Sequence, residues 1–334
     1  MEPNQPYILP SVILKTHTCS WLTKSGGCAM CNYQYVSSFK RKIAENNIIN
    51  QVKWALKELS PMERFPYIHL TSSGSFLDPK EISDELLIKI LKLLNDTDVK
   101  ILSTESRPEY VLNEERLQII KDNFDGYVTI GMGLEAFDDF IRIYCINKGT
   151  TLKIYRDAIE MIKKYDLSFH LYILLGKPFL TVKEDIEDAI KAIRFTVNNG
   201  GVVILFLLNR QPYTLTNWLL ERDKYELPSL WSAVQVLEML KPEERDKVWV
   251  KGLDKAVPMP LEFPSTCPRC TPFVHNAIVG WSYTRNFRLI EQIADCCRCR
   301  DIFYSKYETI PDSLLKERVG REYEWICREL NIDL

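Results

Sequence analysis

A cysteine-rich stretch near the start of the chain, residues 19–31, most constrains what this protein can be. It reads CSWLTKSGGCAMC and places Cys19, Cys28 and Cys31 at the spacing C-x8-C-x2-C. Gly26 and Gly27 permit backbone angles that other residues avoid, so Cys19 can fold back toward the other two cysteines. Clustered thiolates bind iron–sulfur centres or zinc. On a four-iron cluster, three cysteines would leave one iron open to a substrate or cofactor.

Structural zinc is the alternative interpretation of the same stretch. His17 would then complete a closed set of three thiolates and one imidazole with Cys19, Cys28 and Cys31. The spacing is looser than in a standard zinc knuckle. Other parts of the sequence are therefore needed to choose between an iron–sulfur cluster and zinc.

Eight of the ten cysteines lie in tight groups, and only Cys145 and Cys327 stand alone, which favours metal binding over a disulfide framework. The net charge of −2 gives no electrostatic footprint for nucleic acid over the 334 residues as a whole. We find no secretory signal, and the longest apolar run, residues 202–208, is too short to span a bilayer. These features predict a cytoplasmic protein that has no membrane segment.

Hydrophobic periodicity predicts strands that alternate with helices, which argues for a parallel sheet with right-handed crossovers. Six such units closed on one side form an α/β fold, a partial (βα)6 TIM-like barrel. We expect the barrel over residues 1–240 and a cysteine-rich extension with a helical tail over 241–334, beginning with a proline-rich bridge at 241–264. The expected strands are residues 7–14, 67–70, 99–104, 127–132, 168–175 and 201–208.

A second cysteine group, CPRC at 267–270 and CCRC at 296–299, predicts a second metal site. Four thiolates in a closed set indicate structural zinc, with a second iron–sulfur cluster as the alternative. The preferred ligands are Cys267, Cys270, Cys297 and Cys299, with Cys296 as the substitute for Cys297.

Several segments resemble those of a known enzyme family. They are CSWLTKSGGCAMCNY, TSSGSFLDP, ESRPEYV, GMGLEAFDDFIRIYCINKGTT and KPFLT, and the late cysteine pairs match as well. Over residues 7–303 the chain is similar to the radical SAM subunits of archaeosine synthases, within the elongator-type radical S-adenosylmethionine (SAM) group. The resemblance implies a radical SAM barrel with a small metal-binding extension.

The resemblance also implies roles for particular residues. Cys19, Cys28 and Cys31 would hold a catalytic 4Fe–4S cluster, and SAM would bind its open iron. Residues at the carboxyl ends of the strands would contact SAM, where barrels carry their working residues. The alternatives to SAM binding are purely structural. The segment after the second strand could be a turn that caps the next helix, and Glu105 and Arg107 could form a surface ion pair. The expected SAM-binding residues are Ser73, Gly74, Ser75, Glu105, Arg107, Glu135 and Lys148.

Members of this family act on a tRNA that carries a lysine-modified 7-deazaguanine, and they break a carbon–nitrogen bond to leave archaeosine. The resemblance thus implies a lyase, a lysine-transferring partner subunit that brings the tRNA, and an electron donor protein. His69 and His170 lie within strands and are given no role.

Two other functions stay open. Pro212 and Tyr213 stand where the family has Arg-Gly, which leaves room for a radical SAM enzyme with another substrate, such as a modified DNA base or a small molecule. A zinc-binding RNA scaffold that keeps the barrel without the cluster is the third possibility.

Overall fold

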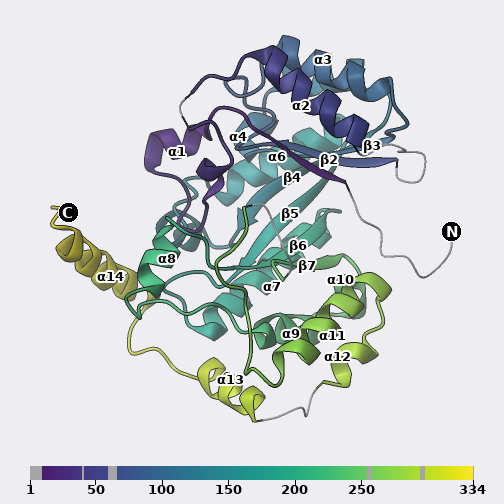
Figure 1. Cartoon of the computed structure of the whole chain (residues 1–334). Coiled ribbons are helices and arrows are strands. Elements are labelled where there is room, and N and C mark those ends of the chain that lie inside the picture. The colour runs from purple at the N-terminus through teal and green to yellow at the C-terminus, as the bar shows by residue number, and fades with distance from the viewer. Residues whose placement is uncertain (1–9, 40, 59–65, 254–257, 294–297, 334) are drawn as a thin grey trace. The chain divides into compact units, whose positions relative to one another are not determined.

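The computed structural model describes residues 10–39, 41–58, 66–253, 258–293 and 298–333. One seven-stranded sheet has the strand order β1-β2-β3-β4-β5-β6-β7, so each strand neighbours the next along the chain. Figure 1 shows the strands and the helices that alternate with them. The chain divides into two compact units, which are described separately below. The first comprises residues 1–134, 151–172 and 199–202, and the second comprises residues 135–150, 173–198 and 203–334.

The first unit is built on parallel strands. His69 of β2 stands in register with Ser11 of β1 and Ser103 of β3, and Ser103 in turn with Thr129 of β4. Leu14, Ile68 and Leu102 are fully buried. The strands with residues in this unit are β1 (Ser11–Leu14), β2 (Tyr67–Ser72), β3 (Ile101–Glu105), β4 (Tyr127–Glu135) and β5 (Ser168–Leu175).

The helices of the first unit begin at recognisable caps. Ser83 accepts a hydrogen bond from the backbone N–H of Leu86, and Asn113 accepts one from the backbone N–H of Arg116. Helix α2 packs on β1 and on α3, which Figure 1 shows side by side. The helices are α1 (Ser20–Ser25), the 3₁₀ turn η1 (Tyr33–Tyr35), α2 (Glu45–Glu58), α3 (Asp84–Asn95), α4 (Pro108–Val111), α5 (Glu114–Asn123) and α6 (Leu152–Lys164).

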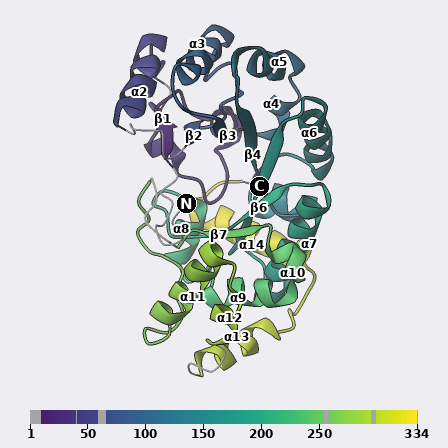
Figure 2. The same ribbon diagram turned by 90° about the vertical axis from the view of Figure 1, so that its right-hand side faces the viewer.

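The second unit carries strands β6 (Val202–Leu207) and β7 (Val248–Lys251), which pair in parallel. Trp231 of α9 and Trp281 of α11 are almost fully buried, and α9, α11 and α12 lie together in Figure 2. The helices are a π-helix (Ile141–Cys145), α7 (Val182–Asn198), α8 (Leu215–Leu220), α9 (Leu230–Met239), α10 (Pro242–Arg245), α11 (Thr271–Thr284), α12 (Arg288–Glu291), α13 (Cys299–Tyr307) and α14 (Leu315–Leu330).

The predicted α/β partial-barrel class is confirmed, and two local expectations were wrong. The supposed bridge over residues 241–264 contains α10 and β7, so the sheet has a seventh strand. Lys247 precedes that strand and Lys251 ends it, which made the segment look like charged surface, although Val248 and Val250 are buried. The domain boundary at residue 240 stays a prediction. Among the helices that the structure describes, none combines the length and the apolar character needed to cross a membrane.

Candidate active site

The cysteine loop, residues 19–31, contains a helix that the sequence did not indicate. Cys19 is the N-cap of α1, and Cys28 and Cys31 follow the helix in a turn closed by a 3.1 Å hydrogen bond from Cys31 N–H to the Cys28 carbonyl. Gly26 ends α1 at φ +80°, and Gly27 follows at φ +86°. Both glycines take the left-handed backbone conformation that residues other than glycine rarely adopt. That Cys19 folds back to meet Cys28 and Cys31 stays a prediction.

The predicted SAM loop, Ser73–Gly74–Ser75, lies directly against the cysteine loop. A Cβ atom on Gly74 would come within 2.7 Å of Cys19 Cα and within 2.9 Å of Cys19 Cβ. The Ser73 side chain donates a 3.0 Å hydrogen bond to the Leu14 carbonyl at the end of β1. Two predicted sets of residues, one for the cluster and one for SAM, are therefore adjacent in the first unit.

Glu81, which the sequence analysis did not single out, lies beneath this loop and is only 6% exposed. Its Oε1 accepts a 2.8 Å hydrogen bond from the Ser75 N–H. Its Oε2 accepts hydrogen bonds from the hydroxyls of Thr16, at 3.0 Å, and Ser72, at 2.9 Å. Burial raises the pKa of Glu81 to about 7, although these three hydrogen bonds oppose the shift.

Glu105, at the end of β3, belongs to a polar network inside the first unit. The Tyr172 hydroxyl donates to Glu105 Oε1 at 2.5 Å, and His69 Nε2 lies 3.2 Å from the same oxygen. Burial disfavours the charged carboxylate, but His69, Tyr172 and the charge of His170 outweigh it and lower the pKa to about 2. Burial lowers the pKa of His170 to about 4. Both histidines thus line this network, a placement that the sequence did not reveal.

Arg107, also predicted to bind SAM, contacts the cysteine loop through Trp21. Its guanidinium carbon lies 4.8 Å from the centre of the Trp21 ring on α1, and its Nη2 lies 2.9 Å from Glu109. Burial opposes the charge of Arg107, but Glu109 and Cys28 favour it and raise its pKa. The surface ion pair between Glu105 and Arg107 that was weighed as an alternative is not the pairing seen, since each carries another partner.

Glu135 and Lys148 belong to the second unit and form a buried ion pair at 3.0 Å. Glu135 has φ +63°, an unusual backbone conformation for a glutamate. Their predicted contact with SAM remains a prediction, because each of the two charges already has a partner in the other.

The second cysteine group comes together as expected for three of its members. The sulfur atoms of Cys267, Cys270 and Cys299 all lie within 4.8 Å of one another, a separation that suits ligands of one metal ion. Trp231 Nε1 donates a 3.3 Å hydrogen bond to the Cys299 sulfur. Cys296 and Cys297, the two candidates for the fourth ligand, lie outside the described residues. The eight described cysteines are all free of disulfides.

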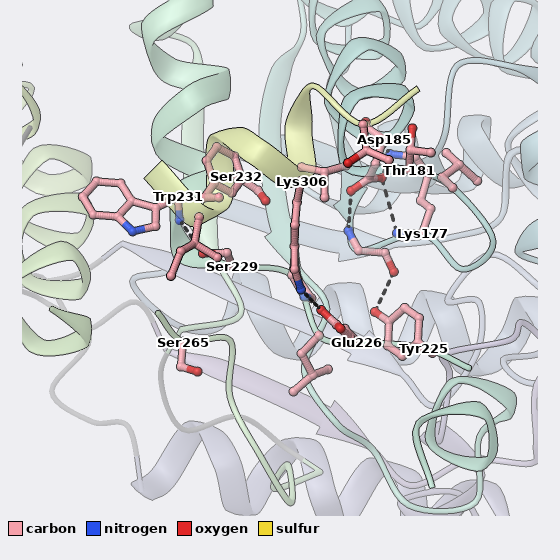
Figure 3. A pocket seen from close by; sticks show the side chains of 18 of the residues that line it. Lys177, Thr181, Asp185, Tyr225, Glu226, Ser229, Trp231, Ser232, Ser265 and Lys306 are labelled. Carbon is pink, nitrogen blue, oxygen red and sulfur yellow. Dashed lines mark hydrogen bonds and ion pairs between the residues drawn. The ribbon is translucent and has the colours of Figure 1, made fainter. Parts of the chain in front are cut away.

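A cavity of about 870 Å³ opens beside Cys267 and Cys299 in the second unit, and Figure 3 shows it at close range. Lys306 reaches across it to Glu226, and the Tyr225 hydroxyl donates to the Gly176 carbonyl at 2.7 Å.

Lys177, which follows β5, is fully buried at one side of this cavity (Figure 3). It pairs with Asp185 at 2.7 Å and with Asp188 at 3.4 Å. Burial opposes its charge, but the two aspartates outweigh this and raise the pKa of Lys177. Because the charge of Lys177 is satisfied by these partners, the residue anchors the start of α7.

Comparison with known proteins shows the family of the chain. The family model described as the radical SAM superfamily matches residues 17–203. An archaeosine synthase subunit beta from Methanosarcina acetivorans is 31% identical over 88% of this chain and 83% of that protein. One from Thermococcus kodakarensis is 30% identical over 86% of this chain and 89% of that protein. An uncharacterized protein of Methanocaldococcus jannaschii is 34% identical, and there the match spans 69% of this chain but only 64% of the relative, less than two thirds of its length.

Two solved structures share the fold at low sequence identity. The Elp3 protein of Methanocaldococcus infernus, with its N-terminus deleted, superposes with a TM-score of 0.52 at 14% identity, over 81% of this chain and 63% of that one. Methylornithine synthase gives a TM-score of 0.52 at 16% identity, over 73% and 65%. The radical SAM type of partial barrel is thereby confirmed. The chain belongs to the radical SAM superfamily, in the family of the archaeosine synthase beta subunits.

Proposed function

We propose that this radical SAM enzyme acts in tRNA modification and breaks a carbon–nitrogen bond in the lysine part of a lysine-modified 7-deazaguanine, which leaves archaeosine. The observation that carries the enzymatic part is the contact of Gly74 with Cys19, which puts a small polar loop beside a three-cysteine motif. The tRNA substrate is supported by the two relatives named archaeosine synthase subunit beta.

The residues of the first unit suit a 4Fe–4S cluster with SAM. Cys19, Cys28 and Cys31 offer three thiolates, and the Cβ-free surface of Gly74 lets the Ser73–Ser75 loop approach them closely. When bound, the cluster and SAM supply a 5′-deoxyadenosyl radical, formed with one electron from an outside donor. The protein's share of the work is to hold these groups and the substrate in place.

Particular side chains divide that work. The Ser73–Ser75 loop offers hydroxyl and backbone groups for the amino group of SAM. Arg107, stacked on Trp21, fixes the flank of the cysteine loop and can pair with the carboxylate of SAM. Glu105 is held as a carboxylate by His69 and Tyr172, so it accepts further hydrogen bonds from a polar ligand such as a ribose. Glu135 and Lys148 are assigned to the same cofactor.

The partners follow from the same proposal. The net charge of −2 does not favour tRNA binding by this chain alone, so a lysine-transferring synthase subunit would present the tRNA. A separate protein would donate the electron. Cys267, Cys270, Cys299 and one of Cys296 or Cys297 would hold a structural zinc ion. We assign the enzyme to the cytoplasm, where free cysteines persist.

The test is anaerobic reconstitution with iron and sulfide, followed by assays of visible absorption and of SAM cleavage. The parent should show an iron–sulfur band and form 5′-deoxyadenosine, whereas Cys28→Ala should do neither. Cys327→Ala, in α14 of the second unit, is the matched control and should behave as the parent. A parent without cluster or cleavage would contradict the enzyme.

The substrate is tested separately, with the partner subunit and lysine-modified tRNA. Conversion of that tRNA to archaeosine-containing tRNA would support the proposed reaction. Cleavage of SAM without any change in this tRNA would instead favour another substrate for the same chemistry.

A further inference from the structure

We propose that Glu81 is a positioning residue that fixes the SAM loop, Ser73–Gly74–Ser75, against the cysteine loop, and so sets where SAM meets the cluster. This inference rests on the proposed function, because it assigns a role to Glu81 within the same site. Glu81 has been assigned no function by the resemblance or by its position in sequence.

The geometry connects three separate segments through one carboxylate. Thr16 lies three residues before Cys19, where the cysteine loop begins, Ser72 ends β2, and Ser75 ends the SAM loop. Each donates a hydrogen bond to Glu81, at 3.0, 2.9 and 2.8 Å respectively. The chain entering the cluster motif and the loop beside it therefore share one anchor.

A second set of contacts reinforces this anchor. The Ser73 N–H donates to the Thr16 hydroxyl at 3.3 Å, and the Thr16 N–H donates to the Ser73 hydroxyl at 3.4 Å. A Cβ on Gly74 would lie 2.2 Å from Glu81 Oε1 as well as 2.7 Å from Cys19 Cα. Gly74 is thus held between the carboxylate and the first cysteine, with no free space on either side.

The turn that carries Glu81 is itself held firmly. Arg116 is almost fully buried, and its Nη2 donates a 2.8 Å hydrogen bond to the carbonyl of Ile82, the residue after Glu81. The Asp78 carbonyl accepts a 3.0 Å hydrogen bond from the Glu81 N–H. Because these hydrogen bonds fix the backbone around Glu81, its carboxylate can hold the loops that it binds in a defined position.

The experiment compares Glu81→Ala and Glu81→Gln with the parent after anaerobic reconstitution. Measured quantities are iron per chain, the dissociation constant for SAM, and the electron paramagnetic resonance spectrum of the reduced cluster with and without SAM. Glu81→Ala should assemble the cluster but bind SAM about tenfold more weakly, because three buried donors lose their acceptor. In the parent, we expect SAM to shift the electron paramagnetic resonance spectrum of the reduced cluster. In Glu81→Ala this shift should be lost.

Glu81→Gln should restore most of this function. The glutamine amide can accept from Ser75 N–H with its oxygen and donate to the two hydroxyls with its nitrogen, which keeps all three links. Its SAM affinity should stay within about threefold of that of the parent. This corresponds to a smaller free energy than the net contribution of one typical hydrogen bond. Glu85→Ala, an exposed glutamate on α3, is the matched control and should leave both readouts unchanged.

If Glu81→Ala fails to retain iron, Thr16→Val and Ser72→Ala decide the matter, since each removes one hydroxyl that donates to Glu81 and leaves Glu81 in place. Weaker SAM binding and an altered SAM-induced spectrum in these two variants would support the proposal. A variant that only melts at lower temperature, while SAM binds and shifts the spectrum as in the parent, would overturn it. A parent that assembles no cluster would instead refute the proposed function.

Discussion

Gly74 packs against Cys19 so closely that a Cβ atom on the glycine would lie 2.7 Å from the Cys19 Cα atom. Real Cβ atoms do not approach backbone atoms to this distance, so Gly74→Ala must push the SAM loop away from the cysteine loop. We expect this variant to lose about tenfold or more in SAM affinity, given a cost of about 1–3 kcal/mol for such crowding. The dissociation constant for SAM, determined on the reconstituted parent and variant, tests this expected loss.

Gly320→Ala is the control for that variant. Gly320 lies within α14, and no heavy atom lies within 4 Å of the Cβ that alanine would add. SAM affinity should match the parent there. Equal affinity in Gly74→Ala and in the parent would contradict the close packing of the two loops.

The stacking of Arg107 on Trp21 predicts a measurable coupling between these residues. In a double-mutant cycle of Arg107→Lys and Trp21→Leu, we expect an interaction free energy of about 1 kcal/mol, because the planar guanidinium is lost at a half-buried ring. Urea unfolding of the four proteins gives this value. Additive effects of the two substitutions would show that the contact does not contribute to stability.

The buried Glu81 predicts how stability depends on pH. Its pKa is about 7 in the folded protein and near 4.5 when unfolded, so the folded state binds more protons between these values. Stability should then fall as the pH rises from about 4.5 to 7, by up to about 3 kcal/mol from this one group. Glu81→Gln does not titrate, so the difference in unfolding free energy between the two proteins should follow that change. A difference independent of pH would contradict it.

Glu105 predicts the opposite dependence at lower pH. Its pKa is lowered to about 2, so it stabilises the folded protein above about pH 4.5 and that contribution is lost as the pH falls toward 2. Tyr172→Phe removes one hydrogen bond to the carboxylate and should lessen this loss while costing about 1–2 kcal/mol at pH 7. Acid titration of parent and variant, followed by circular dichroism, tests both statements.

The second cysteine group predicts that Cys267→Ser releases its metal. With one thiolate removed, zinc per chain should fall well below one and the melting temperature should drop, because metal binding contributes to folding. Metal analysis and thermal melts of parent and variant measure the two effects. Iron in place of zinc would identify a second cluster, and unchanged metal content would exclude Cys267 as a ligand.

Much of the fold could be predicted from the sequence because its strands and helices carry strong periodic patterns. The limits of β5, Ser168–Leu175, were predicted to the residue. Strand β7 was missed because it has only four residues, follows Lys247 and ends on Lys251, and α1 was missed because Ser20–Ser25 has no buried residue to create a pattern. Short elements of this kind depend on tertiary contacts that local sequence does not encode.

The candidate site was predictable only where a motif marked it. The cysteine spacing drew attention to Cys19, whereas Glu81 sits in the charged run DPKEISDE, where nothing in the sequence distinguishes it from its acidic neighbours. His69 and Tyr172 come together with Glu105 from three strands that are distant in sequence. Such convergence depends on strand register, and a single sequence contains no direct record of it.

The interleaving of the two compact units has a consequence for how the protein is made. The last segment of the first unit, residues 199–202, follows residues 173–198 of the second unit along the chain. A ribosome therefore delivers pieces of both units in alternation, and the first cannot be completed before part of the second has emerged. A truncation at a single point likewise cannot separate the two units, because every cut that keeps all of one unit also keeps part of the other.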